Sequence, residues 1–153
     1  PQSSVIGWEI LVLGRRASGE PLRTADFRSE LRLWRDGRCL LDDRAWVRGC
    51  EAGSAALGQR HVSATFWAIA PTAFVADDAE AIAGLIDDAS RPSADEPFHA
   101  TLGAASLIDP HCLLVRVVGD SPQAVRRVLE TAWGALRPRV VQRAAHRPRI
   151  WFT

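Results

Sequence analysis

The chain has 153 residues, of which 47% are hydrophobic and 24% are charged, and its net charge is +1. This length and apolar content suit one ordinary domain with a substantial core, so we expect a single domain over residues 1–153. All 19 basic side chains are arginines, and 18 acidic side chains balance them. Without a cationic excess, neither nucleic acid nor an anionic membrane is favoured as a partner.

No stretch approaches the roughly 18 apolar residues of a membrane-spanning helix, and the first residues lack a signal-peptide pattern. We therefore expect a cytoplasmic protein. Cys39, Cys50 and Cys112 are too few for a disulfide framework and are interpreted as free thiols. The chain contains no methionine and begins at Pro1, which predicts that the natural polypeptide has further sequence upstream.

The first half of the chain reads as strands. Residues 5–13 are almost continuously apolar, which predicts a strand buried on both faces. Residues 27–34 alternate between apolar and polar side chains, as in a half-buried strand. Asp36 and Gly37 both tolerate a positive φ angle, so they predict a tight hairpin turn, with the returning strand beginning at residues 39–41. Residues 60–70 alternate again and predict a further strand.

The second half mixes helices with strands. Asp77, followed three residues later by Glu80, resembles a capping box and predicts a helix at about 77–88. Residues 88–97 are rich in proline, serine and charge and predict an exposed loop. The apolar segments 98–108 and 112–118 predict two strands, separated by a turn at Asp109 and Pro110.

A second helix is predicted at 121–137. Ser121 can cap it, Pro122 suits its first position, and an apolar stripe follows at helical spacing. We expect it to end near Pro138. Together, these patterns predict a mainly β fold, either a sandwich or a helical-like stack of strands, with two α-helices at about 77–88 and 121–137.

The residue types that ligate transition metals are present but scattered. No two cysteines lie two residues apart, and no two histidines stand at i and i+4. Structural or surface roles are therefore favoured over ligation, although a weak, transient metal contact stays open. The histidines concerned are His61, His99, His111 and His146.

Catalytic motifs are equally weak. Ser54 and Ser106 lack a nucleophile-elbow motif, and residues 14–19 contain too few glycines for a nucleotide-binding loop. The acidic pairs at 42–43, 77–78 and 87–88 are expected at turns or helix ends, where they cap helices or face solvent. Glu20, near Arg15 and Arg16, is either an ion-pair partner that fixes a loop or a polar channel residue. We predict no catalytic residue.

The six tryptophans share no common spacing, so they are expected to anchor the core or an interface rather than to form a ligand platform. They are Trp8, Trp34, Trp46, Trp67, Trp133 and Trp151.

An ordered set of short motifs resembles the C-terminal part of urease accessory protein D, also called H. The middle of that family is matched by Gly14, Arg15, Ala17, Gly19 and Glu20, then by Asp36, Gly37 and residues 40–44. Its ending is matched by Leu114, Val115 and Arg116, then Trp133, Leu136 and Arg137, and finally Pro148, Arg149, Ile150, Trp151 and Thr153. These matches keep the family's order over nearly the whole chain.

The resemblance implies a non-catalytic scaffold and metallochaperone subunit that joins accessory proteins F and G, docks on the urease apoprotein and helps pass nickel through an internal polar route. It implies nickel as a transient cargo and no tightly bound cofactor. It also implies that the family's N-terminal part, which completes the sheet, is absent here. The residues expected at partner surfaces or along the route are Arg15, Glu20, Arg44, Arg116, Trp133, Arg149 and Trp151; no nickel ligand is assigned.

Two other readings stay open. A small β-rich hydrolase that uses histidine and aspartate would need a cleft with strongly perturbed ionisable groups. A generic β interaction domain without catalysis would differ from the scaffold only in its partners. Under the scaffold reading, we expect exposed apolar surface where the absent part would pack, and self-association of the isolated chain.

Overall fold

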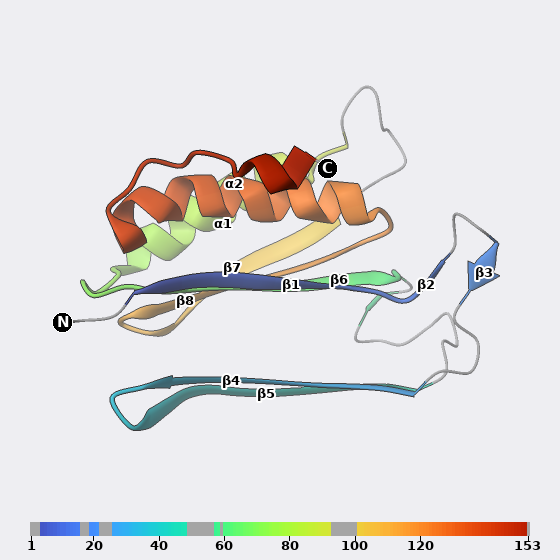
Figure 1. The fold of residues 1–153 in the computed structure, drawn as a ribbon, viewed down its shortest axis with the longest axis horizontal. Helices are drawn as coiled ribbons and strands as arrows, with labels where there is room; N and C mark the ends of the chain where they lie inside the picture. The colour runs from blue at the N-terminus through green and yellow to red at the C-terminus, as the bar shows by residue number, and fades with distance from the viewer. Residues whose placement is uncertain are drawn as a thin grey trace.

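Three layers are stacked in the computed structural model, which describes residues 4–15, 19–21, 26–48, 57–58, 60–92 and 101–152. Two helices cover one face of a four-stranded sheet, and a long β-hairpin lies against the opposite face (Figure 1). This arrangement confirms the predicted mainly β class with two α-helices. The hairpin forms a separate layer because its two strands pair only with each other among the described residues.

The central sheet is antiparallel throughout. Its strand order is β1 (Val5–Val12), β6 (Val62–Ile69), β8 (Cys112–Gly119) and β7 (Thr101–Asp109). All four were predicted, although residues 98–100 of the expected 98–108 strand lie outside the described residues. A short pair, β2 (Gly14–Arg15) and β3 (Glu20–Pro21), follows β1.

The prediction that residues 5–13 are buried on both faces is wrong. β1 is an edge strand of the sheet, and Val5 and Val12 at its ends are 45% and 43% exposed. One face, carrying Ile6, Trp8 and Ile10, packs against the helix-side core. The other face, with Glu9 and Leu11, borders a cavity instead of packing in a core, so β1 lacks the close cover on both sides that a continuous apolar run predicts.

The hairpin consists of β4 (Asp26–Arg35) and β5 (Arg38–Arg48). Its turn is the predicted one, with φ angles of 49° at Asp36 and 76° at Gly37. Positive φ angles at both central positions match the right-handed twist of the flanking strands, which is why this dipeptide closes the hairpin. The predicted alternation of residues 27–34 also holds, because every second residue from Phe27 to Leu33 is partly or fully buried and the residues between them are exposed.

Helix α1 (Ala76–Ser90) begins one residue before the predicted start, and its cap differs from the predicted one. Val75 is the N-cap residue, and the Asp78 carboxylate accepts a hydrogen bond from its backbone amide at 2.6 Å. The expected capping box of Asp77 and Glu80 is therefore wrong. Asp78 stands three residues after Val75, the spacing at which an acidic side chain reaches back to the N-cap amide.

Helix α2 (Pro122–Val141) begins as predicted, because the Ser121 hydroxyl accepts a hydrogen bond from the Ala124 amide at 3.2 Å. Its predicted end near Pro138 is wrong. The helix continues through the proline to Val141, and its C-cap residue Gln142 adopts a left-handed conformation with a φ angle of 54°. The last turn buries Val140 almost completely, and this burial offsets the hydrogen bond that proline cannot donate. A 3-10 helix, η2 (Arg149–Phe152), follows.

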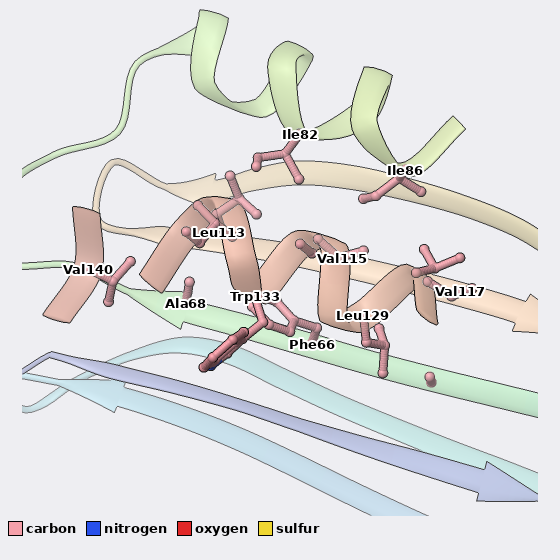
Figure 2. Packing of buried hydrophobic residues seen from close by; sticks show 14 of the residues in the cluster. Phe66, Ala68, Ile82, Ile86, Leu113, Val115, Val117, Leu129, Trp133 and Val140 are labelled. Atoms are coloured by element: carbon pink, nitrogen blue, oxygen red, sulfur yellow. The ribbon is translucent and has the colours of Figure 1, made fainter. Parts of the chain in front are cut away.

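The main core lies between the sheet and the two helices. Figure 2 shows Phe66 of β6, Val115 of β8 and Leu129 of α2 directed into this space, and all three are fully buried. The predicted inner face of the 60–70 strand is confirmed, because its alternate residues are all in this cluster. They are Val62, Ala64, Phe66 and Ala68.

Candidate functional site between the sheet and the hairpin

The hairpin packs against the sheet near its turn. There, Leu33 of β4 packs with Ile69 of β6 and Cys112 of β8 in a second, smaller apolar cluster. Toward the root of the hairpin, an open cavity of about 680 Å³ lies between the two layers. Phe27 and Val47 line it from the hairpin, and Leu11 and Val118 line it from the sheet. A space of this size between two apolar faces is large enough for a polypeptide segment or a small ligand.

A polar row crosses the sheet face of this cavity. Strand register places Glu9 of β1 opposite Thr65 of β6, and Thr65 opposite Arg116 of β8. All three line the cavity, because residues that are directly opposite in paired strands point to the same face. From the hairpin, Asp43 of β5 accepts a hydrogen bond from the Arg116 guanidinium at 2.8 Å.

The charged side chains among the described lining residues are Glu9, Asp43, Arg44 and Arg116, and their formal charges cancel. Asp43 and Arg116 neutralise each other, whereas the structure assigns Glu9 no ion-pair partner among the described residues. Arg44 also borders the cavity, but its guanidinium bonds Asp42 on the outer face at 3.1 Å. Hydrogen bonding from Arg44 lowers the pKa of Asp42 and, reciprocally, raises the pKa of Arg44. Glu9 is therefore the one carboxylate among the described lining residues that no described ion pair neutralises, and it can attract a cation.

Oxygen atoms dominate the groups that could contact a cation there. Carboxylates come from Glu9 and Asp43, and hydroxyls from Ser63 and Thr65, while the described lining residues include no imidazole or thiol. Such oxygen donors bind a transition metal more weakly than imidazole or thiolate ligands do. The arrangement suits brief contact with a passing cation rather than tight retention.

The structure separates the predicted site residues into distinct places. Arg44 and Arg116 meet at the cavity. Arg15 and Glu20 pair through their backbones in β2 and β3, and their side chains lie outside the described part. Arg149 is exposed in η2.

The two predicted tryptophans lie on the other side of the sheet. Trp151 packs between Trp8 and Trp133, with ring centroids 5.0 Å and 4.9 Å apart, respectively. Arg126 of α2 donates a hydrogen bond to the Trp151 carbonyl at 2.9 Å, and it also pairs with Glu130 at 2.8 Å. These contacts fasten η2 to α2 and β1, so the two tryptophans act as structural anchors in this chain.

The histidines and cysteines of the described part do not converge on a metal site, and no group of three or more His, Cys, Asp or Glu side chains there could hold an ion. His111 Nδ1 lies 3.1 Å from the Ala70 carbonyl, and His61 Nδ1 lies 3.5 Å from an Asp120 carboxylate oxygen. Cys39 is exposed and Cys112 is buried. His99 and Cys50 lie outside the described residues.

Sequence reasoning missed the two inner carboxylates. The acidic pair at 42–43 was expected at a turn, but it lies within β5, where neighbouring residues point to opposite faces. Asp42 consequently faces outward and Asp43 faces the cavity. Glu9 was a readable signal, because it is the single charged residue in the apolar run of residues 5–13. The pairs at 77–78 and 87–88 do lie at the two ends of α1, as predicted.

Among the described residues, no helix is both long and apolar enough to cross a membrane. Hydrogen bonds in that part of the chain join no serine or cysteine side chain to a histidine or carboxylate.

Comparison with known proteins gives one consistent result. The sequence profile described as UreD urease accessory protein matches residues 1–152. The chain is 35% identical over 149 residues to urease accessory protein UreD of Azoarcus sp. (strain BH72). The aligned region covers 97% of this chain and 48% of that protein. UreD of Cupriavidus metallidurans is 34% identical over 165 residues, covering 100% and 52%, and UreD of Citrobacter koseri is 32% identical over 154 residues, covering 99% and 48%. The chain thus spans about half the length of these curated relatives, and it belongs to the UreD family of urease accessory proteins.

Proposed function

We propose that this chain is the C-terminal portion of a scaffold and metallochaperone subunit that helps deliver nickel to apo-urease. Its partners are accessory proteins F and G and the urease apoprotein, in the cytoplasm, and it carries out no catalysis itself. Nickel is a transient cargo, and no cofactor is tightly bound. The observation that carries this proposal is the match of the UreD family over residues 1–152.

The interlayer cavity is where we place a segment of the nickel route. The Glu9 carboxylate can attract a cation, and the oxygen donors of the lining allow a cation to leave again, as a route requires. Glu9 supports the proposal most directly, because its carboxylate has no ion-pair partner among the described residues and can attract the cargo.

The rest of the family's polypeptide is proposed to cover this chain's open surfaces. The relatives are about twice as long as the chain, and the cavity walls include exposed apolar side chains such as Leu102, which is 58% exposed. Covering this surface would remove apolar area from water and turn the open cavity into an enclosed passage.

The test is reconstitution of urease activation with the N-terminally completed protein. We would co-express it with F, G and apo-urease, measure complex mass by size-exclusion chromatography with light scattering, and measure urease activity against added nickel. Glu9→Gln should preserve the complex and slow activation. The matched control is Glu30→Gln, which changes a glutamate on the outer face of the hairpin, paired with Arg32.

The outcomes separate the parts of the proposal. Failure of the completed protein to bind F or G would contradict the scaffold assignment. A normal complex with unchanged activation in Glu9→Gln would remove the cavity from the route while leaving the scaffold role in place. A complex with the completed protein but not with the 153-residue chain would assign partner binding to the missing half.

A further inference from the structure

The tip of the β4–β5 hairpin is held to the sheet by a polar cluster. Arg35 donates a hydrogen bond to the Ala70 carbonyl at 3.0 Å, and Arg38 pairs with the Asp109 carboxylate. The backbone amide of His111 donates to the other oxygen of that carboxylate at 2.9 Å. We call these five residues the tip cluster. It ties the hairpin turn to the β7–β8 turn and to the end of β6.

Asp109 is the buried charged group of the tip cluster. Its side chain is only 7% exposed, whereas that of Arg38 is 70% exposed. A buried carboxylate is stable only when donors and a countercharge surround it. Breaking the pair therefore destabilises the buried Asp109 carboxylate more than it destabilises the Arg38 guanidinium, which water can solvate. Loss of the guanidinium would leave this buried charge with the His111 amide as its remaining partner in the described part of the chain.

Further contacts join the two layers below the tip cluster. Leu33, Ile69 and Cys112 form an apolar cluster there, and partly buried residues pack against it: Leu31, Leu40, Leu41, Trp67 and Ile108. At mid-length, Arg116 and Asp43 form the ion pair described above, and both side chains are partly exposed. Beyond that pair, the open cavity lies between the layers. The hairpin is joined to the rest of the chain only at its root, at the opposite end from the tip cluster (Figure 1).

We propose that the β4–β5 hairpin is a flap that can separate from the sheet, and that Arg38 and Arg116 are the positioning residues that hold it closed. Release of the tip cluster lets the hairpin swing away and opens the cavity from the tip inward. This inference rests on the contacts between the layers and goes beyond the proposed nickel route, because the flap would control access for any occupant of the cavity.

Cys112 is a natural reporter of this motion. It lies on the sheet face beneath the hairpin, next to Leu33, and is completely buried. Burial raises the pKa of its thiol to about 11, so it is unreactive toward thiol reagents while it is covered. Opening of the flap would expose the thiol without unfolding the helix-side core, since that core lies on the other face of the sheet.

The experiment measures the rate at which Cys112 reacts with a disulfide reagent such as DTNB under native conditions. Cys39→Ser and Cys50→Ser, present in every variant, make Cys112 the single thiol. Arg38→Ala and Arg116→Ala are compared with Arg44→Ala, which removes an arginine of the same hairpin that bonds outward to Asp42. Urea unfolding of each variant gives the global free energy of unfolding, and with it the labelling rate that global unfolding alone would produce.

We expect Arg38→Ala to raise the labelling rate about tenfold or more, the size of effect expected when a buried charged group loses a partner. Arg116→Ala should give a smaller rise, and Arg44→Ala should leave the rate unchanged. For Arg38→Ala and Arg116→Ala, the labelling rate should rise more than the measured loss in the global free energy of unfolding would explain. High ionic strength should increase labelling of the parent protein more than that of Arg38→Ala, because salt screens the pair that this variant lacks.

Two results would overturn the proposal. One is an unchanged labelling rate in Arg38→Ala with the fold intact. The other is a rate that rises only in proportion to the loss of global stability, which would mean that Cys112 is reached by unfolding rather than by movement of the flap. If Arg38→Ala does not fold, Arg38→Gln and the salt dependence of the parent protein decide between the same two readings.

Discussion

Arg116 of β8 donates a hydrogen bond to Asp43 of β5 at 2.8 Å, and this ion pair crosses from the central sheet to the hairpin. Its side chains are 55% and 30% exposed, so solvent screens the attraction. A double-mutant cycle with Arg116→Ala and Asp43→Ala should give a coupling of at most about 1 kcal/mol in the free energy of unfolding, and less at high salt. A coupling well above that value would show that the pair is more buried than in this structure.

Gly103 of β7 is a position where the two layers of the main core meet too closely for a side chain. A Cβ atom there would lie 2.4 Å from Cγ2 of Ile86 in α1. Gly103→Ala should therefore lower the free energy of unfolding by about 1–3 kcal/mol, because α1 must shift or Ile86 must change rotamer. Chemical denaturation measures this loss.

Gly84 in α1 provides the matched control, since a Cβ atom there would meet nothing within 4 Å. Gly84→Ala should raise the free energy of unfolding by about 0.5–1 kcal/mol, because alanine favours the helical backbone more than glycine does. Equal effects of the two glycine substitutions would contradict the packing of α1 against β7.

Cys112 should make the protein less stable in alkali. Burial raises its pKa from 9.0 to about 11 in the folded state, so below about pH 9 the thiol is protonated in both the folded and unfolded states. As the pH rises from about 9 to 11, the unfolded chain loses this proton first, and the free energy of unfolding falls by about 2–3 kcal/mol. The chain contains no lysine or tyrosine, so few other groups titrate in this range.

The measurement is urea unfolding across this pH range for the parent and for Cys112→Ala. The alanine variant should lack most of the decline, whatever its stability at neutral pH. Cys39→Ala, which removes an exposed thiol, should keep it. If the free energy of unfolding declined equally in Cys112→Ala and Cys39→Ala, the buried thiol would not be the source of the decline.

Trp151 should contribute strongly to stability although it lies close to the end of the chain. It packs against Trp8 and Trp133, so Trp151→Ala removes contacts with both β1 and α2. We expect a loss of about 2–3 kcal/mol in the free energy of unfolding. Trp34→Ala changes a tryptophan that is 59% exposed on the hairpin and should cost less than about 0.5 kcal/mol. Thermal unfolding of both variants tests this contrast, which would disappear if η2 were not docked on α2.

The cap of α1 allows a direct comparison of two neighbouring aspartates. Asp78 accepts the hydrogen bond from the Val75 amide and also pairs with Arg139 of α2, whereas Asp77 is exposed. Asp78→Ala should lower the free energy of unfolding by about 1 kcal/mol or more, and Asp77→Ala by less than about 0.5 kcal/mol. The reverse order would restore the capping box that the sequence alone favoured.

Local patterns predicted most elements correctly because their causes are local. The hairpin turn follows from the positive φ angles that Asp36 and Gly37 tolerate, and the start of α2 follows from the Ser121 hydroxyl. Alternation along β6 identified its core face for the same reason, since side chains of a strand point alternately to its two faces. These signals involve residues only a few positions apart.

Errors occurred where distant residues decide the outcome. Pro138 would end an isolated helix, but burial of Val140 in the core extends α2 by another turn. Asp78 was passed over as the cap because the sequence does not reveal that Arg139, 61 residues away, pairs with it. The status of β1 as an edge strand likewise depends on which strands lie beside it.

The sequence by itself determined the family, the fold class and the positions of the hairpin, the four strands of the central sheet and the two α-helices, because backbone preferences, periodicity and ordered motifs are encoded locally. It did not predict β2, β3 or η2. Only the tertiary structure decided which side chains share a site. In the structure, Arg44 and Arg116 border the cavity, and Glu9 and Asp43 line it as well. Trp133 and Trp151 lie on the opposite side of the sheet. The reason is physical: alternation shows which face of a strand is apolar, but the cavity depends on how a separately paired hairpin packs against the sheet, which the pattern of a single strand does not encode.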